Sequence, residues 1–517
     1  MNLQPHSRQM NSAATTILKA DQNQARGLGQ FAIDFVNGQS NPDPTVLDRV
    51  VAFHRDSVAC AVSALSLGAN APDVLRQEAL QYVCSDVSQG VPCFGSCQAV
   101  FPEKAVVANC SAVREWDANG TNFGYNPAWG HTEGEFGHND FYPVAVAAAQ
   151  LGQQNGRQLL LGMLCLDEIR GRLAEVFALR KYKIDHVLHG GIASAAVYGA
   201  MLGASAEQIE SAIGMVVSHY VPYRAIRAGH QLSDSKGASA ALSAEMAVVS
   251  VHRAMAGFVG PTDILRNPQA VFCWNEPVDQ PDCSPFELRL SMAGGDFAIM
   301  GMHFKLGLYE HQSAGAIQGL LDVLSTYPDL LNNPNQLQSV RITIYEPAFS
   351  IIGDPAKRDP KTRQSADHSM VYIIATLLRK AYQTRQSTWQ TLMLLPADYN
   401  DQSLHHPLTR QIMGKIVFEH GGDLYDQQYP DGIPTSLTIE HRTLGLMSSG
   451  RVLYPAGHAR YSSTGVDELL DHKFYRLTES AVDNPQHLHN RLTNLVALSR
   501  SDIASLYSFE ISNVRTS

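Results

Sequence analysis

The chain has 517 residues and a formal net charge of −10, with 44% hydrophobic and 17% charged residues. This length and composition are typical of a globular protein that needs two domains rather than one simple core. The negative charge argues against a nucleic-acid binder, which needs a basic face for the phosphates, and no apolar run reaches the ~18 residues of a membrane-spanning helix. The low charged fraction indicates that part of the surface is covered by another subunit.

The eight cysteines lie mostly in apolar surroundings and form no Cys-x-x-Cys pair. A disulfide framework is not expected at this size, so we predict reduced thiols in a cytoplasmic protein, with the mitochondrial matrix as the alternative for a eukaryotic source. Cys93 and Cys97 flank a Gly/Ser turn but lack a second pair of ligands, so no metal site is predicted. Residues 1–24 are expected to be a flexible N-terminus, whose basic start resembles a transit peptide only weakly.

Residues 25–285 are predicted to form an all-α domain, because apolar residues recur there with helical spacing. The expected helices cover 25–36, 46–68, 156–179, 191–204, 206–218 and 236–257. Ser205 and Gln208 form a capping box for the fifth of these. Alanine and glycine dominate the fourth, and such small residues let helices approach closely.

The stretch 114–150 interrupts this helical pattern with a loop rich in ionisable groups and glycine, followed by an Ala/Val run. Asn139 or Asp140 is expected to cap the helix that follows, with Pro143 tolerated in its first turn. Imidazoles and carboxyls on a loop held by a helix start are typical of acid/base sites. A solvated loop with ordinary caps is the alternative.

The period changes after residue 285, and a smaller α+β lid domain is predicted over 286–461. Residues 339–345 and 436–441 alternate with the period of strands, and 451–454 are expected to pair with the second strand across a turn at 448–450. Helices are predicted at 310–326 and 367–382. The C-terminal residues 462–517 return to helical patterns and are expected to pack back on the first domain.

Two further segments carry candidate chemistry. Arg224, Arg227 and Lys236 lie close to the start of a predicted helix, and guanidinium forks near a helix N-terminus suit carboxylates; the alternative is a solvated basic turn. Lys305 lies among apolar residues near two histidines, where a lysine either snorkels or takes part in catalysis. The sequence contains no GxSxG, P-loop, dinucleotide or HExxH motif.

Together these segments resemble the MmgE/PrpD family, which includes 2-methylcitrate dehydratase and cis-aconitate decarboxylase. The similar segments are WDANGT (116–121), GHND (137–140), FKLGLYEHQSA (304–314), ADHSMVY (366–372) and YPAGHAR (454–460). The resemblance implies a mainly α fold with an all-α domain, a smaller α+β lid and the site between them. It also implies a homodimer without a cofactor. One departure is Gly120, which stands where the family has its second aspartate.

The resemblance implies a lyase that dehydrates a citrate-like tricarboxylic acid, most simply 2-methylcitrate or citrate. His138 is the expected base, with Lys305 in the same acid/base system and Asp117 and Thr121 orienting the reacting groups; His131 is the alternative histidine. Arg224, Arg227, Lys236 and Arg460 are expected to anchor the carboxylates. The other residues expected to bind the substrate are His311, His368, Tyr372 and His458.

Two alternatives remain open at this point. The same residues would serve a decarboxylase of a cis-aconitate-type acid, or an epimerase acting at an acidic C–H bond. A non-catalytic carboxylate-binding protein would need the cations but no proton-transferring groups.

Overall fold

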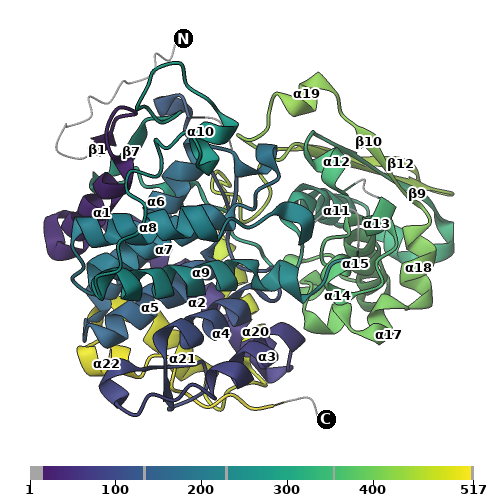
Figure 1. Cartoon of the computed structure of the whole chain (residues 1–517). Helices are drawn as coiled ribbons and strands as arrows, with labels where there is room; N and C mark the ends of the chain where they lie inside the picture. Colours follow the sequence, from purple (N-terminus) through teal and green to yellow (C-terminus); the bar gives the residue numbers. More distant parts are fainter. Residues whose placement is uncertain (1–14, 132–134, 227–230, 353–354, 514–517) are drawn as a thin grey trace.

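The computed structural model describes residues 15–131, 135–226, 231–352 and 355–513. Two lobes are visible in Figure 1: a large helical lobe, and a smaller lobe built on a four-stranded sheet with helices on it. We call them the helical lobe and the sheet lobe. This is the mainly helical fold with a C-terminal mixed sheet expected from the sequence.

The helical lobe contains the first ten α-helices of the chain. They are α1 (Gln24–Asp34), α2 (Pro44–Ser66), α3 (Asn70–Ala79), α4 (Pro102–Arg114), α5 (Tyr142–Leu151), α6 (Gly156–Val176), α7 (Val187–Met201), α8 (Ala206–His219), α9 (Asp234–Met255) and α10 (Val271–Asn275). The helices predicted from periodicity all occur, and Ser205 with Gln208 forms the expected capping box at α8.

Helix α7 lies at the centre of this lobe, and each of its residues is buried. It packs against α6, α8 and α9. Glycine makes one close approach there: a Cβ on Gly190 would lie 2.0 Å from the ring of Phe141. The small residues that dominate this segment therefore allow the helices to pack around it.

The start of the chain differs from the prediction for residues 1–24. Residues 1–14 lie outside the described residues, but β1 (Thr15–Leu18) pairs antiparallel with β7 (Leu288–Ser291). In addition, Gln24 donates from its buried amide to the carbonyl of Phe286. The segment from 15 is therefore anchored, and residues 286–291, which we assigned to the lid, lie against the helical lobe.

The helical lobe also carries short two-stranded ladders, so it is not purely α. They join β2 (Asn41–Pro42) to β8 (Ala293–Gly294), β3 (Val91–Pro92) to β4 (Ala99–Val100), and β5 (Thr121–Phe123) to β6 (Glu135–His138).

The sheet lobe has the strand order β10-β9-β11-β12, with bounds Ile416–His420, Leu337–Ile344, Thr435–His441 and Gly445–Val452. Only the β10–β9 pair is parallel. Its helices are α11 (Ala314–Thr326), α12 (Ala348–Ile352), α13 (Pro355–Arg358), α14 (Arg363–Ala366), α15 (Met370–Thr384), α16 (Trp389–Leu392), α17 (Asp401–Leu404), α18 (Pro407–Met413) and α19 (Asp423–Asp426).

The predicted turn at 448–450 is wrong. The β11–β12 hairpin turns between His441 and Gly445, and the three residues of the predicted turn lie inside β12. The register shifts opposite Ser436 to Thr438, so Ser449 and Gly450 form an irregularity within the ladder. Serine and glycine favour turns, but a bulge in a strand needs the same backbone freedom.

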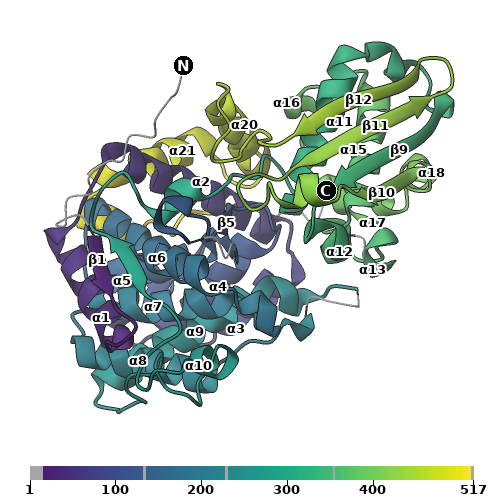
Figure 2. The same cartoon turned by 90° about the horizontal axis from the view of Figure 1, so that it is seen from above.

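The C-terminal segment returns to the helical lobe as expected, through α20 (Val466–Thr478), α21 (Pro485–Thr493) and α22 (Arg500–Ala504). Helices α20 and α21 pack on α2, and α22 packs on α5. Figure 2 shows α20 beside α2, at the junction of the two lobes. The helical lobe is thus built from both ends of the chain.

Within the described ranges, no single helix combines the length and apolar character needed to cross a membrane. Helices α2 and α3 meet that test only as a pair, bent by 88° at the break between them.

Candidate active site

A cavity of about 80 Å³ lies between the two lobes. The helical lobe contributes Arg114, Asp117, Thr121, His138, His186, Arg224, Leu232 and Lys236; the chain beyond it contributes Lys305, Glu310, His311, Gln312, Ile351, Lys357 and His368. Eight residues predicted from the sequence line this cavity: Asp117, Thr121, His138, Arg224, Lys236, Lys305, His311 and His368.

The carboxylate of Asp117 is the centre of the cavity's ion-pair network, and cationic donors reach both of its oxygens. Lys305 Nζ lies 2.7 Å from Oδ1, and Arg114 contacts the same oxygen. Lys236 Nζ lies 2.8 Å and His368 Nε2 2.7 Å from Oδ2. These donors come from four separate segments, so Asp117 holds both lobes at one point.

This surrounding charge decides the ionisation of Asp117. Burial alone would raise its pKa, but Arg114, Lys236, Lys305 and His368 outweigh burial and hold the pKa well below its ordinary value. The carboxylate stays ionised, and the cations around it exceed its single charge. Such an excess suits a ligand that brings several carboxylates.

His138 lies beside Arg114, and this contact determines which nitrogen of the imidazole carries the proton. Arg114 Nη2 is 3.2 Å from His138 Nε2. Because a guanidinium only donates, Nε2 accepts and the neutral ring carries its proton on Nδ1, 3.9 Å from Asp117 Oδ1. Burial, then Arg114 and Lys305, lowers the pKa of His138 well below its ordinary value. Our assignment of His138 as the base is therefore not favoured: Arg114 uses the lone pair of Nε2, and Nδ1–H can only donate a hydrogen bond.

Lys305 is buried and closely held. Its ammonium donates to the backbone oxygen of Asp117 at 2.6 Å as well as to the carboxylate. Burial lowers the pKa of Lys305; Asp117 opposes this effect and Arg114 reinforces it. A lysine in this state is not snorkelling, because its charged end lies in the cavity wall rather than in solvent.

His311 adds a second buried imidazole to the wall. Burial, then Lys305 and His458, lowers its pKa well below the ordinary value. Neither ring nitrogen has a hydrogen-bond partner among the described residues. His311 therefore offers a neutral ring with an unused lone pair.

The loop that carries His138 is held by contacts that replace the predicted helix caps. Neither Asn139 nor Asp140 caps α5; both lie in a 3₁₀ turn, and Phe141 precedes the helix. Asp140 instead accepts from Asn119 at 2.6 Å and pairs with Arg114 at 3.4 Å. Asp140 thus ties the end of the loop to α4 and to the segment before β5.

The packing around residue 120 explains why a glycine stands at this position. A Cβ there would lie 2.3 Å from Asn139 Oδ1 and 2.3 Å from the ring of Phe53. The space that a side chain at this position would need is already filled, so an aspartate does not fit without rearrangement.

Gly120→Ala is expected to destabilise the protein by about 1–3 kcal/mol, the usual cost of overpacking a closed site. Denaturant unfolding of the variant against the wild type measures this. Gly130→Ala is a poor control because of its positive φ; Gly301→Ala, where a Cβ would meet nothing within 4 Å, is the matched one. Equal stability of Gly120→Ala and wild type would contradict the steric account.

Four predicted residues that the structure describes do not line the cavity. His131 Nδ1 pairs with Glu175 at 3.0 Å. Tyr372 donates to the carbonyl of Asp398 at 2.5 Å. His458 and Arg460 line a separate cavity of about 170 Å³. Arg227 lies outside the described residues.

Several residues of the wall were not predicted from the sequence, namely Arg114, His186, Glu310, Gln312 and Lys357. Glu310 and Gln312 flank His311 in the segment 304–314, so they could have been predicted as cavity residues from their neighbour. Burial raises the pKa of Glu310, although His368 opposes this. His186 and Lys357 stand in no segment that we had singled out.

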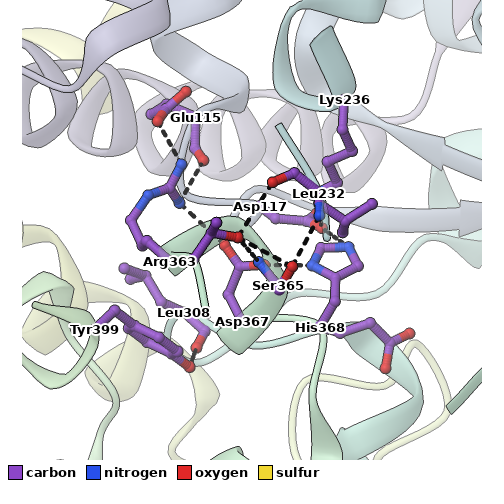
Figure 3. A network of polar contacts seen from close by, with 12 residues as sticks. Glu115, Asp117, Leu232, Lys236, Leu308, Arg363, Ser365, Asp367, His368 and Tyr399 are labelled. Atoms are coloured by element: carbon purple, nitrogen blue, oxygen red, sulfur yellow. Dashed lines mark hydrogen bonds and ion pairs between the residues drawn. The ribbon is translucent and has the colours of Figure 1, made fainter. Parts of the chain in front are cut away.

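A chain of ion pairs joins the sheet lobe to the loop that carries Asp117 (Figure 3). Arg363 in α14 reaches Glu115 at 2.5 Å and Asp367 at 3.0 Å. His368 contacts Asp367 through one ring nitrogen and Asp117 through the other. Burial raises the pKa of Glu115 to about 7, against the effect of Arg363. This chain fixes the lobes relative to each other at the cavity.

Asp117, Asp367 and His368 also bring potential metal ligands within 4.8 Å of one another. Lys236 and Lys305 already contact the oxygens of Asp117. A cation bound there would face both ammonium groups at close range. The group is therefore better described as part of the ion-pair network.

Comparison with known proteins agrees with this architecture. Residues 30–282 match the MmgE/PrpD N-terminal domain, and residues 309–496 match the MmgE/PrpD C-terminal domain. The 2-methylcitrate dehydratase of Salmonella typhi is 24% identical over 373 residues, which are 70% of this chain and 73% of that protein. The enzyme of the same name from Escherichia coli K12 is 23% identical over 352 residues, 66% of this chain and 69% of that protein.

A probable 2-methylcitrate dehydratase of Saccharomyces cerevisiae is similar over a longer stretch. It is 23% identical over 455 residues, 85% of this chain and 83% of that protein. Both family domains are present and in order; the C-terminal match covers the sheet lobe and continues through α20 and α21, which pack on the helical lobe. The chain belongs to the MmgE/PrpD family, which includes hydro-lyases such as 2-methylcitrate dehydratase.

Proposed function

We propose that this protein is a lyase that dehydrates a citrate-like tricarboxylic acid, 2-methylcitrate or citrate, to the corresponding alkene. One observation carries the proposal: the interlobe cavity combines an excess of cations around Asp117 with buried neutral imidazoles. The cations would neutralise substrate carboxylates, and the imidazoles would move protons. The distant similarity to dehydratases supports the same reading.

The dehydration requires that a base remove a proton from the carbon next to a carboxylate, while an acid protonates the departing hydroxyl as water. Lys305 is proposed to give a proton from its ammonium to the departing hydroxyl, and the Nδ1–H of neutral His138 to donate a hydrogen bond to the same oxygen. His311, with its unused lone pair, is proposed to accept the carbon-bound proton. Arg224 and Lys236 are proposed to hold the carboxylates, which stabilises the charge that develops on the carbon.

Incubation with 2-methylcitrate, citrate and cis-aconitate in separate reactions tests the proposal. We expect absorbance of a new alkene from the first or second acid and no release of CO₂. Release of CO₂ from cis-aconitate would identify the decarboxylase alternative instead. Binding of these acids without turnover would identify a carboxylate-binding protein.

We predict that turnover needs no added metal and survives EDTA. The physical reason is that lysine ammonium groups contact both oxygens of Asp117 and would repel a cation. The rate is measured before and after chelation and dialysis. Loss of activity that iron or zinc restores would overturn this prediction.

We also propose that the protein is a homodimer formed through the helical lobe. Large apolar side chains are exposed just after α9 and on α10, among them Phe258, Val259 and Trp274, which is 71% exposed. Exposed apolar side chains on a chain with few charged residues suit an interface. Sedimentation at micromolar concentration is expected to give a dimer, and Trp274→Glu to weaken it. A monomeric wild type at that concentration would contradict the proposal.

A further inference from the structure

We propose that Lys473 in the C-terminal helix α20 is a positioning residue that holds the two catalytic segments of the cavity together. Its side chain is completely buried. Its ammonium donates to the carbonyl of Ala118 at 2.6 Å and to the carbonyl of Lys305 at 2.9 Å. The third contact is an ion pair with Asp56 of α2 at 2.7 Å. All three N–H bonds of the ammonium are therefore used.

The two carbonyls belong to the segments whose side chains meet in the cavity. Ala118 follows Asp117 directly, and Lys305 is the residue whose ammonium contacts the Asp117 carboxylate. Lys473 thus joins the backbones of the two segments on the side away from the cavity, while the side chains of Lys305 and Asp117 pair in the cavity wall. Because Lys473 does not line the cavity, it acts only through these segments.

Helix α2 supports the same segment at successive turns. Arg49 donates to the carbonyl of Met302 at 2.6 Å. The ring of Phe53 stacks on Phe304 with centroids 3.9 Å apart. Asp56 completes the series through Lys473. These positions recur on one face of the helix, so α2 and α20 together form the floor beneath residues 302–305.

Burial of the Lys473–Asp56 ion pair costs desolvation free energy, which the attraction between the two charges does not always offset. Burial raises the pKa of Asp56, although Lys473 opposes this, and Asp56 Oδ2 has no hydrogen-bond partner among the described residues. A pair that stabilised the fold only by its charge could be replaced by apolar residues at little cost. What apolar residues could not supply is a donor that joins two carbonyls from separate segments.

The inference rests on the proposed function, since it assigns a role in turnover. Lys473→Met removes the donor, and Lys473→Met with Asp56→Asn removes the donor and the unpaired buried charge together. If Lys473 only stabilises the fold, the double variant should regain both melting temperature and kcat. If Lys473 positions the site, the double variant should regain melting temperature while kcat per folded enzyme stays at least ~10-fold below wild type, with KM changed much less.

Lys380→Met serves as the matched control. Lys380 also pairs with a carboxylate, Asp398, at 2.7 Å and donates to a backbone carbonyl, that of Met393, at 2.7 Å. It lies in α15 and lines no part of the cavity. This variant is expected to lose melting temperature with kcat unchanged. A kcat for either Lys473 variant within about twofold of wild type, measured per folded enzyme, would overturn the inference.

A crystal structure of a Lys473 variant provides a readout that needs no turnover. We expect Lys305 Nζ to move out of hydrogen-bond distance of Asp117 in Lys473→Met or in the double variant. An unchanged distance between these two groups would overturn the inference even if the wild type turned over none of the three acids. A wild type without turnover, together with a displaced Lys305 ammonium in the variant, would reject the proposed function and leave the positioning role standing.

Discussion

Lys305→Ala and His138→Ala are each expected to lower kcat by at least about 10²-fold, the usual scale of lost general acid–base catalysis. The double variant should be little worse than either single variant, because residues that act as one proton-transfer unit do not contribute additively. Steady-state kinetics on the acid that wild type turns over measures all three.

The structure gives the reason for this coupling. Lys305 lowers the pKa of His138, after burial and Arg114, and both residues face the same carboxylate of Asp117. Removal of Lys305 would therefore relieve part of the lowering of the His138 pKa. A purely structural role predicts a lower melting temperature with kcat nearly intact in the folded fraction.

His131→Ala is the control, because the structure holds His131 on Glu175 and outside the cavity. Its kcat is expected to stay within a few-fold of wild type. Turnover abolished by His131→Ala but kept by His138→Ala would move the catalytic role to His131. If neither histidine mattered, the acid/base reading of the whole 114–150 stretch would fail.

Asp117→Asn is expected to have the largest effect on stability, about 3–5 kcal/mol, the scale for removing one partner of a buried ion pair. The neutral amide would leave Lys236, Lys305 and Arg114 without the charge that compensates them. Denaturant unfolding at pH 7 measures the loss. Asp398→Asn is the matched control, since Asp398 also lies between a lysine and an arginine but outside the cavity.

The pH dependence of this difference has a definite sign. The folded pKa of Asp117 lies well below its ordinary value, so its contribution is fully present above the unfolded pKa of about 4 and is lost as the pH falls further. The stability gap between wild type and Asp117→Asn should therefore be constant from pH 7 to about 5 and narrow below about 4. A gap that widened on acidification would contradict the assignment.

Local patterns predicted most of the fold correctly. Helical spacing identified the helices, and the cap at Ser205 gave the start of α8, because both depend on residues close in sequence. The hairpin turn was misplaced because Ser448-Ser449-Gly450 has the composition of a turn, while the register that puts these residues inside β12 is set by pairing with β11. Local composition carries no information about that register.

The candidate site was predicted only in part, for a related reason. Asp117 and His138 stood out because they lie in a stretch dense in polar groups, and Lys305 because it lies among apolar residues close to two histidines. Nothing in the sequence indicates that Arg114 donates a hydrogen bond to Nε2 of His138. This contact uses the lone pair that the expected base would need. Lys473 stands in an ordinary amphipathic helix, and its role depends on carbonyls that are 355 and 168 residues away.

The return of the C-terminal helices to the helical lobe sets the order in which the protein can be completed during translation. Ala118 leaves the ribosome 355 residues before Lys473, the residue that anchors its carbonyl. At typical elongation rates this interval is roughly 20 to 70 seconds. During this interval the helical lobe lacks α20, so a chain cut short after the sheet lobe holds every cavity residue and still lacks the helix that carries Lys473.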